Sequence, residues 1–345
     1  MRVLHFIDAL DYGGAETLMM SYIPMLNEFE HTVVTLNGPN VYGISNFEYL
    51  ELDLMPGKNF FKIAKAIKRI VQEKKIDIVH SHSFWTNIIS RYATSKHMKL
   101  INHYHFADYD TRRQKVSVKR MILLDKIVRH KGMLRVGVSE YVGNILRKTF
   151  PGKPVKVIPN FIHCSPVQNI PKTHNDGLLK IIAVGNCNLE KNYALVLAAF
   201  QLLTDDPIHI DIIGGGGKLE FYRKEVERLG LSNVNFLGHD SGVREKLSNY
   251  HLYLSTSFSE TFGISVLEAV CAKLPIMLSD IPVFKEIAPQ GVIFFNPFDS
   301  EELARCLREF LQTKNQIDAV AYDKVLKKYS SFQFLERVRQ LYSFS

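Results

Sequence analysis

The stretch SFSETFGISVLEAVCAKLPIMLSD, residues 257–280, contains a polar loop, a helical pattern and a short apolar run, in that order. The apolar run LYLS at 252–255 precedes it. The whole segment therefore predicts a strand, a helix and a second strand, which is typical of a parallel βαβ unit. We expect Thr261 to cap the helix and the helix to continue through Glu268 to about Lys273. Its first N–H groups would suit a diphosphate, with Glu260 in the adjoining loop.

The same alternation of apolar runs and amphipathic stretches extends along the rest of the chain. The segment 160–177, which contains several Pro and Asn residues, interrupts it and reads as a linker. The length of 345 residues also favours about two domains. We therefore predict an α/β protein with an N-terminal domain at 1–160, a linker at 161–177, a C-terminal domain at 178–325 and a C-terminal helix at 326–345.

The composition excludes several classes of protein. Apolar residues make up 46% and charged residues 23%, as in ordinary folded domains. No apolar run reaches the length of about eighteen residues that a membrane-spanning helix needs, and the short apolar run at 2–7 predicts a buried strand, not a signal peptide. The cysteines form no C-x-x-C pair, so we expect neither a disulfide framework nor a structural zinc site, and we infer a reducing, cytoplasmic location. They are Cys164, Cys187, Cys271 and Cys306.

The net charge of +8 is concentrated in the first half of the chain. Residues 1–170 contain 24 Lys and Arg against 14 Asp and Glu, whereas residues 171–345 contain 19 against 21. The segment 111–132 predicts a basic helix. This helix is either a solvated face packed on the sheet or a contact for anionic lipid or a lipid-diphosphate acceptor, and no motif indicates nucleic acid. The basic patch consists of Arg112, Arg113, Lys115, Lys119 and Arg120.

The pair Glu260-x7-Glu268, with Phe262-Gly263 inside it, resembles the E-x7-E signature of the retaining glycosyltransferase family 4, or glycosyl transferases group 1. This resemblance implies the GT-B fold, in which two Rossmann-like parallel-sheet domains face each other across a cleft and a C-terminal helix packs back on the N-terminal domain. Further blocks resemble the family's blocks in order and spacing: GGAE (13–16), NHYHFAD (102–108), VGVSEYV (136–142), VKVIPNF (155–161), VGNCNLEKN (184–192), DIIGGGGKL (211–219) and VNFLGH (234–239).

The resemblance implies transfer of a hexosyl group, with retention, from a UDP- or GDP-linked sugar to an acceptor hydroxyl. It places Glu260 on the donor-sugar hydroxyls, Glu268 on the ribose and Lys191 on the diphosphate. It also places His105, or His103 one pleat away, beside the donor sugar. Glu260, His105 and Lys191 are the expected catalytic residues. Further donor contacts are implied for Gly13, Gly14, Gly185, Asn186, Gly214, Gly215, Phe262, Gly263 and Ile264.

One position departs from the family pattern. Asn186 follows Gly185 where the family usually has an arginine that contacts phosphate. An amide can donate a hydrogen bond to phosphate but supplies no charge, although Arg244 or Lys218 could compensate. Two alternatives follow: a catalytically weak subunit that binds nucleotide sugar or glycan in an assembly complex, and a nucleotide-sugar epimerase of the same fold, against which the E-x7-E block argues.

Histidine pairs and one acidic motif raise the question of a metal. His80, His82, His103 and His105 form two H-x-H pairs, whose members share a strand face. A four-histidine metal site is one interpretation, and structural histidines, with one beside the donor, are the other. Asp108-Tyr109-Asp110 spells the D-x-D motif that glycosyltransferases of another fold use to hold a metal, but a solvated loop is the expectation here. We expect no cofactor and no metal.

The expected partners are a nucleotide sugar and a glycan or lipid-linked acceptor. A basic, signal-free chain of this length suits surface polysaccharide or glycan assembly. We expect it to act in the cytoplasm, as a peripheral protein at the inner face of the cytoplasmic membrane.

Overall fold

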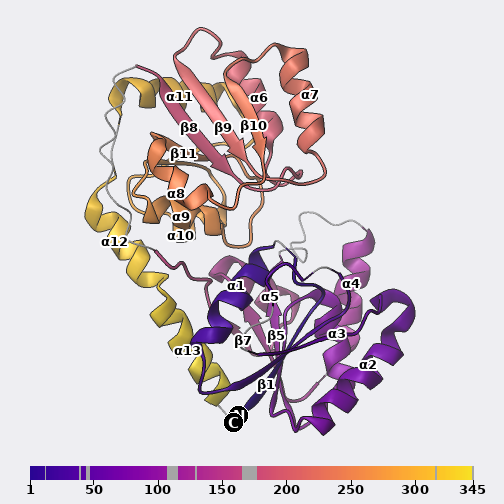
Figure 1. Ribbon diagram of the computed structural model, residues 1–345. Helices are drawn as coiled ribbons and strands as arrows, with labels where there is room; N and C mark the ends of the chain where they lie inside the picture. Colours follow the sequence, from indigo (N-terminus) through magenta and orange to yellow (C-terminus); the bar gives the residue numbers. More distant parts are fainter. Residues whose placement is uncertain are drawn as a thin grey trace. The chain divides into compact units, whose positions relative to one another are not determined.

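The computed structural model divides the chain into two compact units (Figure 1). Unit 1 contains Met1–Phe161 and Ser331–Ser345, and unit 2 contains Ile162–Ser330. The structure describes all residues except 12, 39, 44–46, 107–115, 129, 165–176, 315–316 and 344–345, and it leaves the side chains of 116 and 117 undescribed.

Unit 1 is built on a parallel sheet with the strand order β3-β2-β1-β4-β5-β6-β7. The strands are β1 (Arg2–Ile7), β2 (Glu30–Thr35), β3 (Glu48–Glu51), β4 (Ile78–Ser81), β5 (Lys99–Tyr104), β6 (Met133–Gly137) and β7 (Val155–Val157). The helices are α1 (Gly14–Tyr22), α2 (Pro56–Glu73), α3 (Phe84–Ala93), α4 (Val116–Ile127), α5 (Glu140–Thr149) and α13 (Ser331–Ser343), with a 3-10 turn η1 at Ile23–Met25.

The alternation of side chains along β1 explains how helices cover both faces of this sheet. Val3 and Ile7 pack into a core with residues of α1 and α13, whereas Leu4 and Phe6 point to the opposite face and pack with α2 and α3. Because both faces are covered, the central strands are buried, and with their apolar residues they bury polar ones such as His5, His80 and His103.

Unit 2 repeats this plan with a six-stranded parallel sheet in the order β10-β9-β8-β11-β12-β13 (Figure 1). Helices α6, α7 and α11 cover one face through a continuous apolar core. The strands are β8 (Leu179–Val184), β9 (Ile208–Ile213), β10 (Val234–Gly238), β11 (Leu252–Ser255), β12 (Ile276–Ser279) and β13 (Ile293–Phe295). The helices are α6 (Tyr193–Gln201), α7 (Leu219–Leu229), α8 (Val243–Lys246), α9 (Ile264–Cys271), α10 (Pro282–Ile287), α11 (Ser300–Thr313) and α12 (Ala319–Lys328), with a 3-10 turn η3 at Leu247–Asn249.

The predicted fold class, two Rossmann-like parallel sheets, is confirmed. One local prediction is wrong, because the helix after β11 begins at Ile264 and not after Thr261. Gly263 is its N-cap residue, and the φ of +93° there is the left-handed conformation that glycine adopts without strain. The chain therefore turns sharply before the helix and continues through 261–263 without helical structure.

The sequence predicted no disulfide framework, but one disulfide is present. Cys164 and Cys271 form a disulfide, with their Cα atoms 5.6 Å apart, although 107 residues separate them in the sequence. The fold brings Cys164, near the start of unit 2, to Cys271, the last residue of α9. No sequence motif predicts this contact. Cys187 and Cys306 are free and buried. Within the described part of the chain, no helix has the length and apolar character needed to cross a membrane.

Candidate functional site

The carboxyl ends of β8, β9 and β11 form the candidate site of unit 2. The chain order reverses at β8, which pairs with β9 on one side and β11 on the other. In open parallel sheets, ligands bind at this switch point, outside the carboxyl ends of the strands. The loops that leave these three strands carry most of the donor residues that the sequence predicts.

Two predicted catalytic residues meet at this point. The Lys191 ammonium group lies 2.5 Å from Oε1 of Glu260, and the Ser257 hydroxyl donates to the same oxygen at 3.0 Å. The side chains of Lys191 and Glu260 keep 18% and 16% of their surface exposed, so the pair is partly desolvated yet reachable from solvent. Thr256 fixes the local backbone by donating to the Lys191 carbonyl at 2.8 Å. The arrangement gives one cation and one carboxylate, held in place, for a polar ligand.

Glycines let the loops after β8 and β9 approach each other closely. A Cβ on Gly214 would overlap the carbonyl group of Gly185, and a Cβ on Gly185 would lie 2.5 Å from Cε of Lys191. The N–H of Cys187 donates to the Gly215 carbonyl at 2.6 Å, which ties the two loops together. Gly185 thus leaves room for the Lys191 side chain, and the backbone contact excludes any larger residue at Gly214.

The start of α9 supplies the third part of the site. In its first turn the N–H groups of Ile264 and Ser265 have no intrahelical acceptors, whereas the Val266 N–H donates to the Gly263 carbonyl at 3.1 Å. A Cβ on Gly263 would lie 3.0 Å from the Phe284 ring, so sterics as well as φ require glycine there. The side chain of Phe262 is buried, which leaves only its backbone for a ligand.

Glu268 lies on the second turn of α9 and is not free. Oε1 of Glu268 accepts from Nε of Arg244 at 2.7 Å, and the Glu268 side chain is 13% exposed. Tyr253 of β11 shows that both glutamates lie within electrostatic range of one point. Burial raises the pKa of Tyr253, and the charges of Glu260 and Glu268 raise it further. The charges of both signature glutamates therefore act on Tyr253.

The structure places both residues that could compensate for Asn186. Arg244 is paired with Glu268, as described above. Lys218 follows the glycine loop, and its N–H donates to the Cys187 carbonyl at 3.2 Å, one residue after Asn186. The Lys218 backbone therefore lies at the same contact between loops as Asn186, whereas Arg244 lies on α8.

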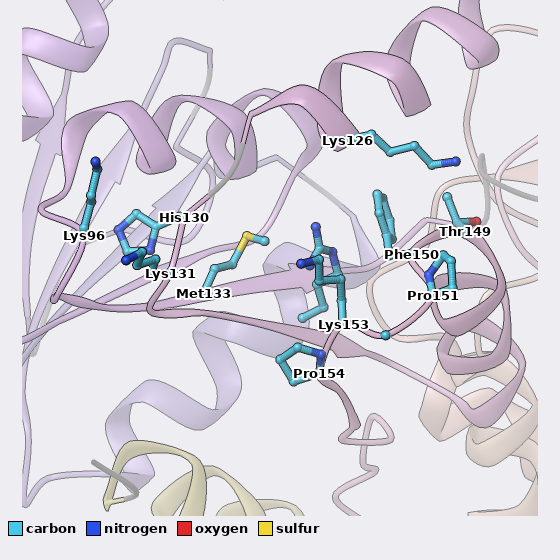
Figure 2. Close-up of a pocket in the computed structure, with 12 residues that line it drawn as sticks. Lys96, Lys126, His130, Lys131, Met133, Thr149, Phe150, Pro151, Lys153 and Pro154 are labelled. Carbon is cyan, nitrogen blue, oxygen red and sulfur yellow. The ribbon is translucent and has the colours of Figure 1, made fainter.

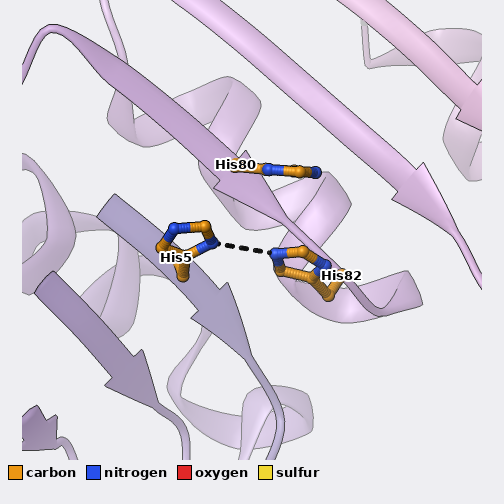
Figure 3. Close-up of side chains that lie close together, drawn as sticks. All are labelled: His5, His80 and His82. Carbon is orange, nitrogen blue, oxygen red and sulfur yellow. Dashed lines mark hydrogen bonds between the residues drawn. The ribbon is translucent and has the colours of Figure 1, made fainter. Parts of the chain in front are cut away.

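In unit 1, the predicted histidines form one network, in which His80, His82 and His103 are buried and His105 is partly exposed. Figure 3 shows His5 of β1 beside His80 and His82, with Nδ1 of His5 3.3 Å from Nε2 of His82. Nδ1 of His82 lies 3.4 Å from Nε2 of His105, and Nε2 of His80 lies 3.2 Å from Nδ1 of His103. The Tyr342 hydroxyl of α13 lies 2.8 Å from Nδ1 of His80. The parallel pairing of β1, β4 and β5 brings these rings to one face of the sheet.

The hydrogen-bond partners assign the protons along this network. His31 extends it, because its Nδ1 lies 3.0 Å from Nε2 of His5 and its Nε2 lies 3.0 Å from the Leu26 carbonyl. A carbonyl only accepts, so His31 carries its proton on Nε2 and accepts on Nδ1. Because Nδ1 of His31 accepts, Nε2 of His5 must donate to it and Nδ1 of His5 must accept in turn. The same step, repeated along the contacts to His82 and His105, places a proton on Nε2 of each of these rings. His105 is thereby left with a lone pair on Nδ1.

Burial keeps these rings neutral. Desolvation lowers the pKa of His80 and His105 to about 3, and it lowers the pKa of His5, His82 and His103 well below the ordinary value. Neutral imidazoles can ligate a metal. Two triads have ligand atoms within 4.8 Å of one another: His5 with His80 and His82, and His82 with His103 and His105. That no metal is required stays a prediction.

The glycine loop of unit 1 lies in an acidic setting. Gly13 is the N-cap residue of α1, and a Cβ there would meet the Glu16 carboxylate. Burial raises the pKa of Glu16, with Asp8 and Asp11 adding to the shift. A phosphate beside Gly13 and Gly14 therefore requires Glu16 to be protonated or to turn away.

The predicted basic patch is only partly described. Lys119 and Arg120 are exposed on α4. Arg112, Arg113 and Lys115 lie outside the described residues, as do Asp108 and Asp110 of the D-x-D motif. The predicted basic helix at 111–132 is observed as α4, Val116–Ile127.

Two family models together match most of the chain. The model described as Glycosyltransferase Family 4 matches residues 12–165, and the model described as Glycosyl transferases group 1 matches residues 168–326. The chain belongs to glycosyltransferase family 4. This confirms the family that the E-x7-E pair, the glycine loops and the EKN segment indicate.

Relatives and solved structures agree with this family. The phosphatidylinositol N-acetylglucosaminyltransferase gpi3 subunit of Schizosaccharomyces pombe is 24% identical over 96% of this chain and 75% of its own length. The O-antigen chain mannosyltransferase RfbU of Salmonella typhimurium is 34% identical over 57% of this chain and 56% of its own length. The structure of Anabaena HepE in complex with UDP-glucose superposes with a TM-score of 0.80, at 16% identity and with 99% of both chains covered. This glycosyltransferase therefore has the GT-B fold.

Several site residues escaped the sequence analysis. His5 and His31 join the histidine network, Ser257 binds Glu260, and Tyr342 reaches His80 from the last helix. His5 occupies an alternating position in a predicted strand, and that signal becomes informative only when the sheet order places β1 beside β4. The contacts of Ser257 and Tyr342 had no sequence signal.

Proposed function

We propose that this glycosyltransferase transfers a hexosyl group from a UDP- or GDP-linked sugar to an acceptor hydroxyl and retains the anomeric configuration. The observation that carries the proposal is the cluster of Lys191, Glu260 and Ser257 at the switch point of unit 2, beside the glycine loops and the start of α9. A cation, free N–H groups and a close-packed glycine backbone suit a diphosphate. The nearby carboxylates suit sugar and ribose hydroxyls.

In the proposed reaction, the bond between the anomeric carbon and the diphosphate oxygen breaks while the acceptor oxygen bonds to the same carbon. The acceptor proton passes to the departing phosphate, which leaves as a nucleoside diphosphate. Lys191 would exchange Glu260 for this phosphate, and Glu260 would then accept from donor-sugar hydroxyls. Each charge-assisted hydrogen bond contributes about 1.5–3 kcal/mol, and contacts that strengthen as charge develops lower the barrier.

The remaining roles are proposed from the family resemblance. Glu268 would accept from the ribose hydroxyls after Arg244 moves aside, and His105 of unit 1 would hydrogen-bond the donor sugar through its Nδ1 lone pair. Two relatives named for transfer to phosphatidylinositol and to an O-antigen chain support a glycan or lipid-linked acceptor. From these names and the basic residues of 111–132 we also propose peripheral action at the inner face of the cytoplasmic membrane. The proposed reaction uses no cofactor and no metal.

Slow donor hydrolysis tests this proposal without an identified acceptor. The purified chain is incubated with UDP-glucose, UDP-N-acetylglucosamine or GDP-mannose, and proton NMR follows the first anomer released. We expect one donor to release its nucleoside diphosphate together with a sugar of unchanged anomeric configuration, and K191A to abolish the release. The exposed Lys224 of α7 supplies the matched control, since K224A should keep wild-type turnover. An inverted first product would contradict retention.

A catalytically weak subunit is the second candidate, because Asn186 supplies no charge to the leaving group. The relative named as a subunit supports it. This candidate expects nucleotide binding without donor hydrolysis in the isolated chain, and N186R should then raise hydrolysis. If the wild-type chain already hydrolyses a donor rapidly and N186R has no effect, this candidate is wrong.

A further inference from the structure

Unit 1 contains a basic cavity that the proposed reaction does not use. It has a volume of about 820 Å³, within the range of ligand sites (Figure 2). The segments that lead into β5, β6 and β7 line it, together with the ends of α4 and α5. Its described lining residues include no acidic side chain. They include five Lys or Arg side chains: Lys96, Lys126, Lys131, Arg135 and Lys153.

The cavity and the histidine network lie at opposite ends of the unit 1 sheet. All strands of this sheet are parallel. His103 and His105 lie at the carboxyl end of β5, whereas Lys96 precedes the amino end of that strand at Lys99. A six-residue strand spans roughly 17–20 Å. The cavity is therefore a separate place in the fold.

A buried arginine, Arg135, supplies positive charge that its described neighbours balance only in part. Arg135 is 4% exposed, and its Nε has no hydrogen-bond partner among the residues that the structure describes. Its Nη2 lies 3.5 Å from Oδ1 of Asp125, but that oxygen already pairs with Arg91 at 2.7 Å. Two guanidinium groups share one carboxylate, so the trio carries a net charge of +1. A buried charge of this kind favours an anion beside it.

His130 adds a second unsatisfied atom to the same wall. It is 9% exposed, and its Nε2 lies 2.7 Å from the Ser95 carbonyl, which fixes a proton on that nitrogen. Its Nδ1 is buried and has no partner within the described residues. A protonated ligand oxygen, or a ligand anion with His130 protonated, would satisfy this nitrogen. Phosphate monoesters and diesters present oxygens of these kinds.

The remainder of the wall is apolar. Met133 and Phe150 are buried, and Pro151 and Pro154 join them in the lining (Figure 2). The Arg135 guanidinium lies 4.1 Å from the centroid of the Phe150 ring, so its flat face is covered and its N–H edge is the part left to donate. Cationic groups beside an apolar wall suit a molecule with an anionic head and an apolar tail.

We propose that this cavity binds the phosphate group of an amphiphile, with Arg135 and His130 contacting the phosphate and Lys131 and Lys153 at its rim. The phosphate can come from a lipid headgroup or from a free phosphate compound, and the apolar wall favours the lipid. The proposal does not rest on the donor site, because none of the donor residues lines the cavity.

The test compares two charge-matched double variants of the full chain. K131Q/K153Q removes two exposed charges at the cavity, and K62Q/K65Q removes two exposed charges on α2. Co-sedimentation with phosphatidylcholine vesicles, with and without phosphatidylglycerol, measures lipid binding. Titration with inorganic phosphate, followed by NMR of the histidine rings, measures binding of the free anion. Each lysine near an anionic surface is worth about a fivefold change in affinity, so K131Q/K153Q should bind roughly 25-fold more weakly.

The outcomes are separable. Binding only to vesicles that contain phosphatidylglycerol, weakened in K131Q/K153Q but not in K62Q/K65Q, supports a lipid headgroup. Saturable inorganic phosphate binding with the same variant pattern, and no vesicle binding, supports a free phosphate. Equal weakening in both double variants, or no binding of either probe, overturns the proposal. Nucleotide binding measured on K131Q/K153Q should match the wild type, which keeps this result distinct from any failure of the donor site.

Discussion

Mild acid should destabilise unit 1 through its buried histidines, and His80 allows the effect to be isolated. His80 is 1% exposed, and burial lowers its pKa to about 3, against an ordinary value of 6.5. Below pH 6.5 the unfolded chain therefore takes up a proton that the folded chain refuses. Stability that is present above pH 6.5 is lost as the pH falls toward 3.

The magnitude follows from the shift. On acidification from pH 7.5 to pH 5.0, the pH falls about 1.5 units below the ordinary histidine pKa of 6.5, so the side chain becomes protonated in the unfolded chain while His80 stays neutral in the folded state. At about 1.36 kcal/mol per unit, His80 alone should remove about 2 kcal/mol of unfolding free energy. H80Q deletes this contribution. Its loss of the contacts to Tyr342 and His103 changes stability at both pH values and cancels when the two are subtracted.

Urea unfolding followed by the fluorescence of Trp85 measures the effect, because the single tryptophan of the chain lies on α3 of unit 1. The wild type should lose about 2 kcal/mol more than H80Q over this pH interval. The exposed His97 provides the control, and H97Q should behave like the wild type. If the wild type and H80Q lose the same free energy, the argument from the buried neutral network is wrong.

Three further predictions concern the loops, the disulfide and metal. G185A should weaken nucleotide binding by about 10- to 150-fold, the equivalent of one charge-assisted hydrogen bond, because its Cβ displaces Lys191 from Glu260. A Cβ on Gly217 would face open space, so G217A should bind nucleotide like the wild type in calorimetric titration. Equal affinities of G185A and G217A would contradict this prediction. C164S should lower the unfolding free energy by about 2–4 kcal/mol, and reducing agent should then have no further effect in urea unfolding. Dialysis against EDTA should leave release of nucleoside diphosphate from the donor unchanged, because Lys191 supplies the positive charge, and a loss that Mn²⁺ restores would refute this.

Much of the fold could be predicted because parallel strands buried on both faces form continuous apolar runs. The predicted strands at 2–7 and 252–255 match β1 and β11 residue for residue. The edge strands β3 and β7 lacked this signal, since β3 reads EYLE and β7 has only three residues. Short or polar edge strands are one way in which proteins protect the side of a sheet that lacks a neighbour.

The site was predictable where one segment contains its parts. Glu260, Gly263 and Glu268 lie in one loop and one helix, so their grouping could be inferred from spacing. Contacts made through the sheet order could not. Lys191 meets Glu260 across 69 residues because β8 pairs with β11. The resemblance placed Lys191 at the diphosphate but indicated nothing of its pairing in the free protein.

The central claim is that the switch point of unit 2 binds a nucleoside diphosphate, and a thermal-shift panel with UDP, GDP and ADP tests it most directly. At a free nucleotide concentration of about one hundred times Kd, binding adds about 2.7 kcal/mol to the free energy of unfolding. We predict stabilisation by one nucleotide, lost in K191A and E268A. The same stabilisation should persist in K224A and E227A, whose exposed positions on α7 match these changes in charge. Equal stabilisation in all four variants, or none in the wild type with any nucleotide, would contradict the account.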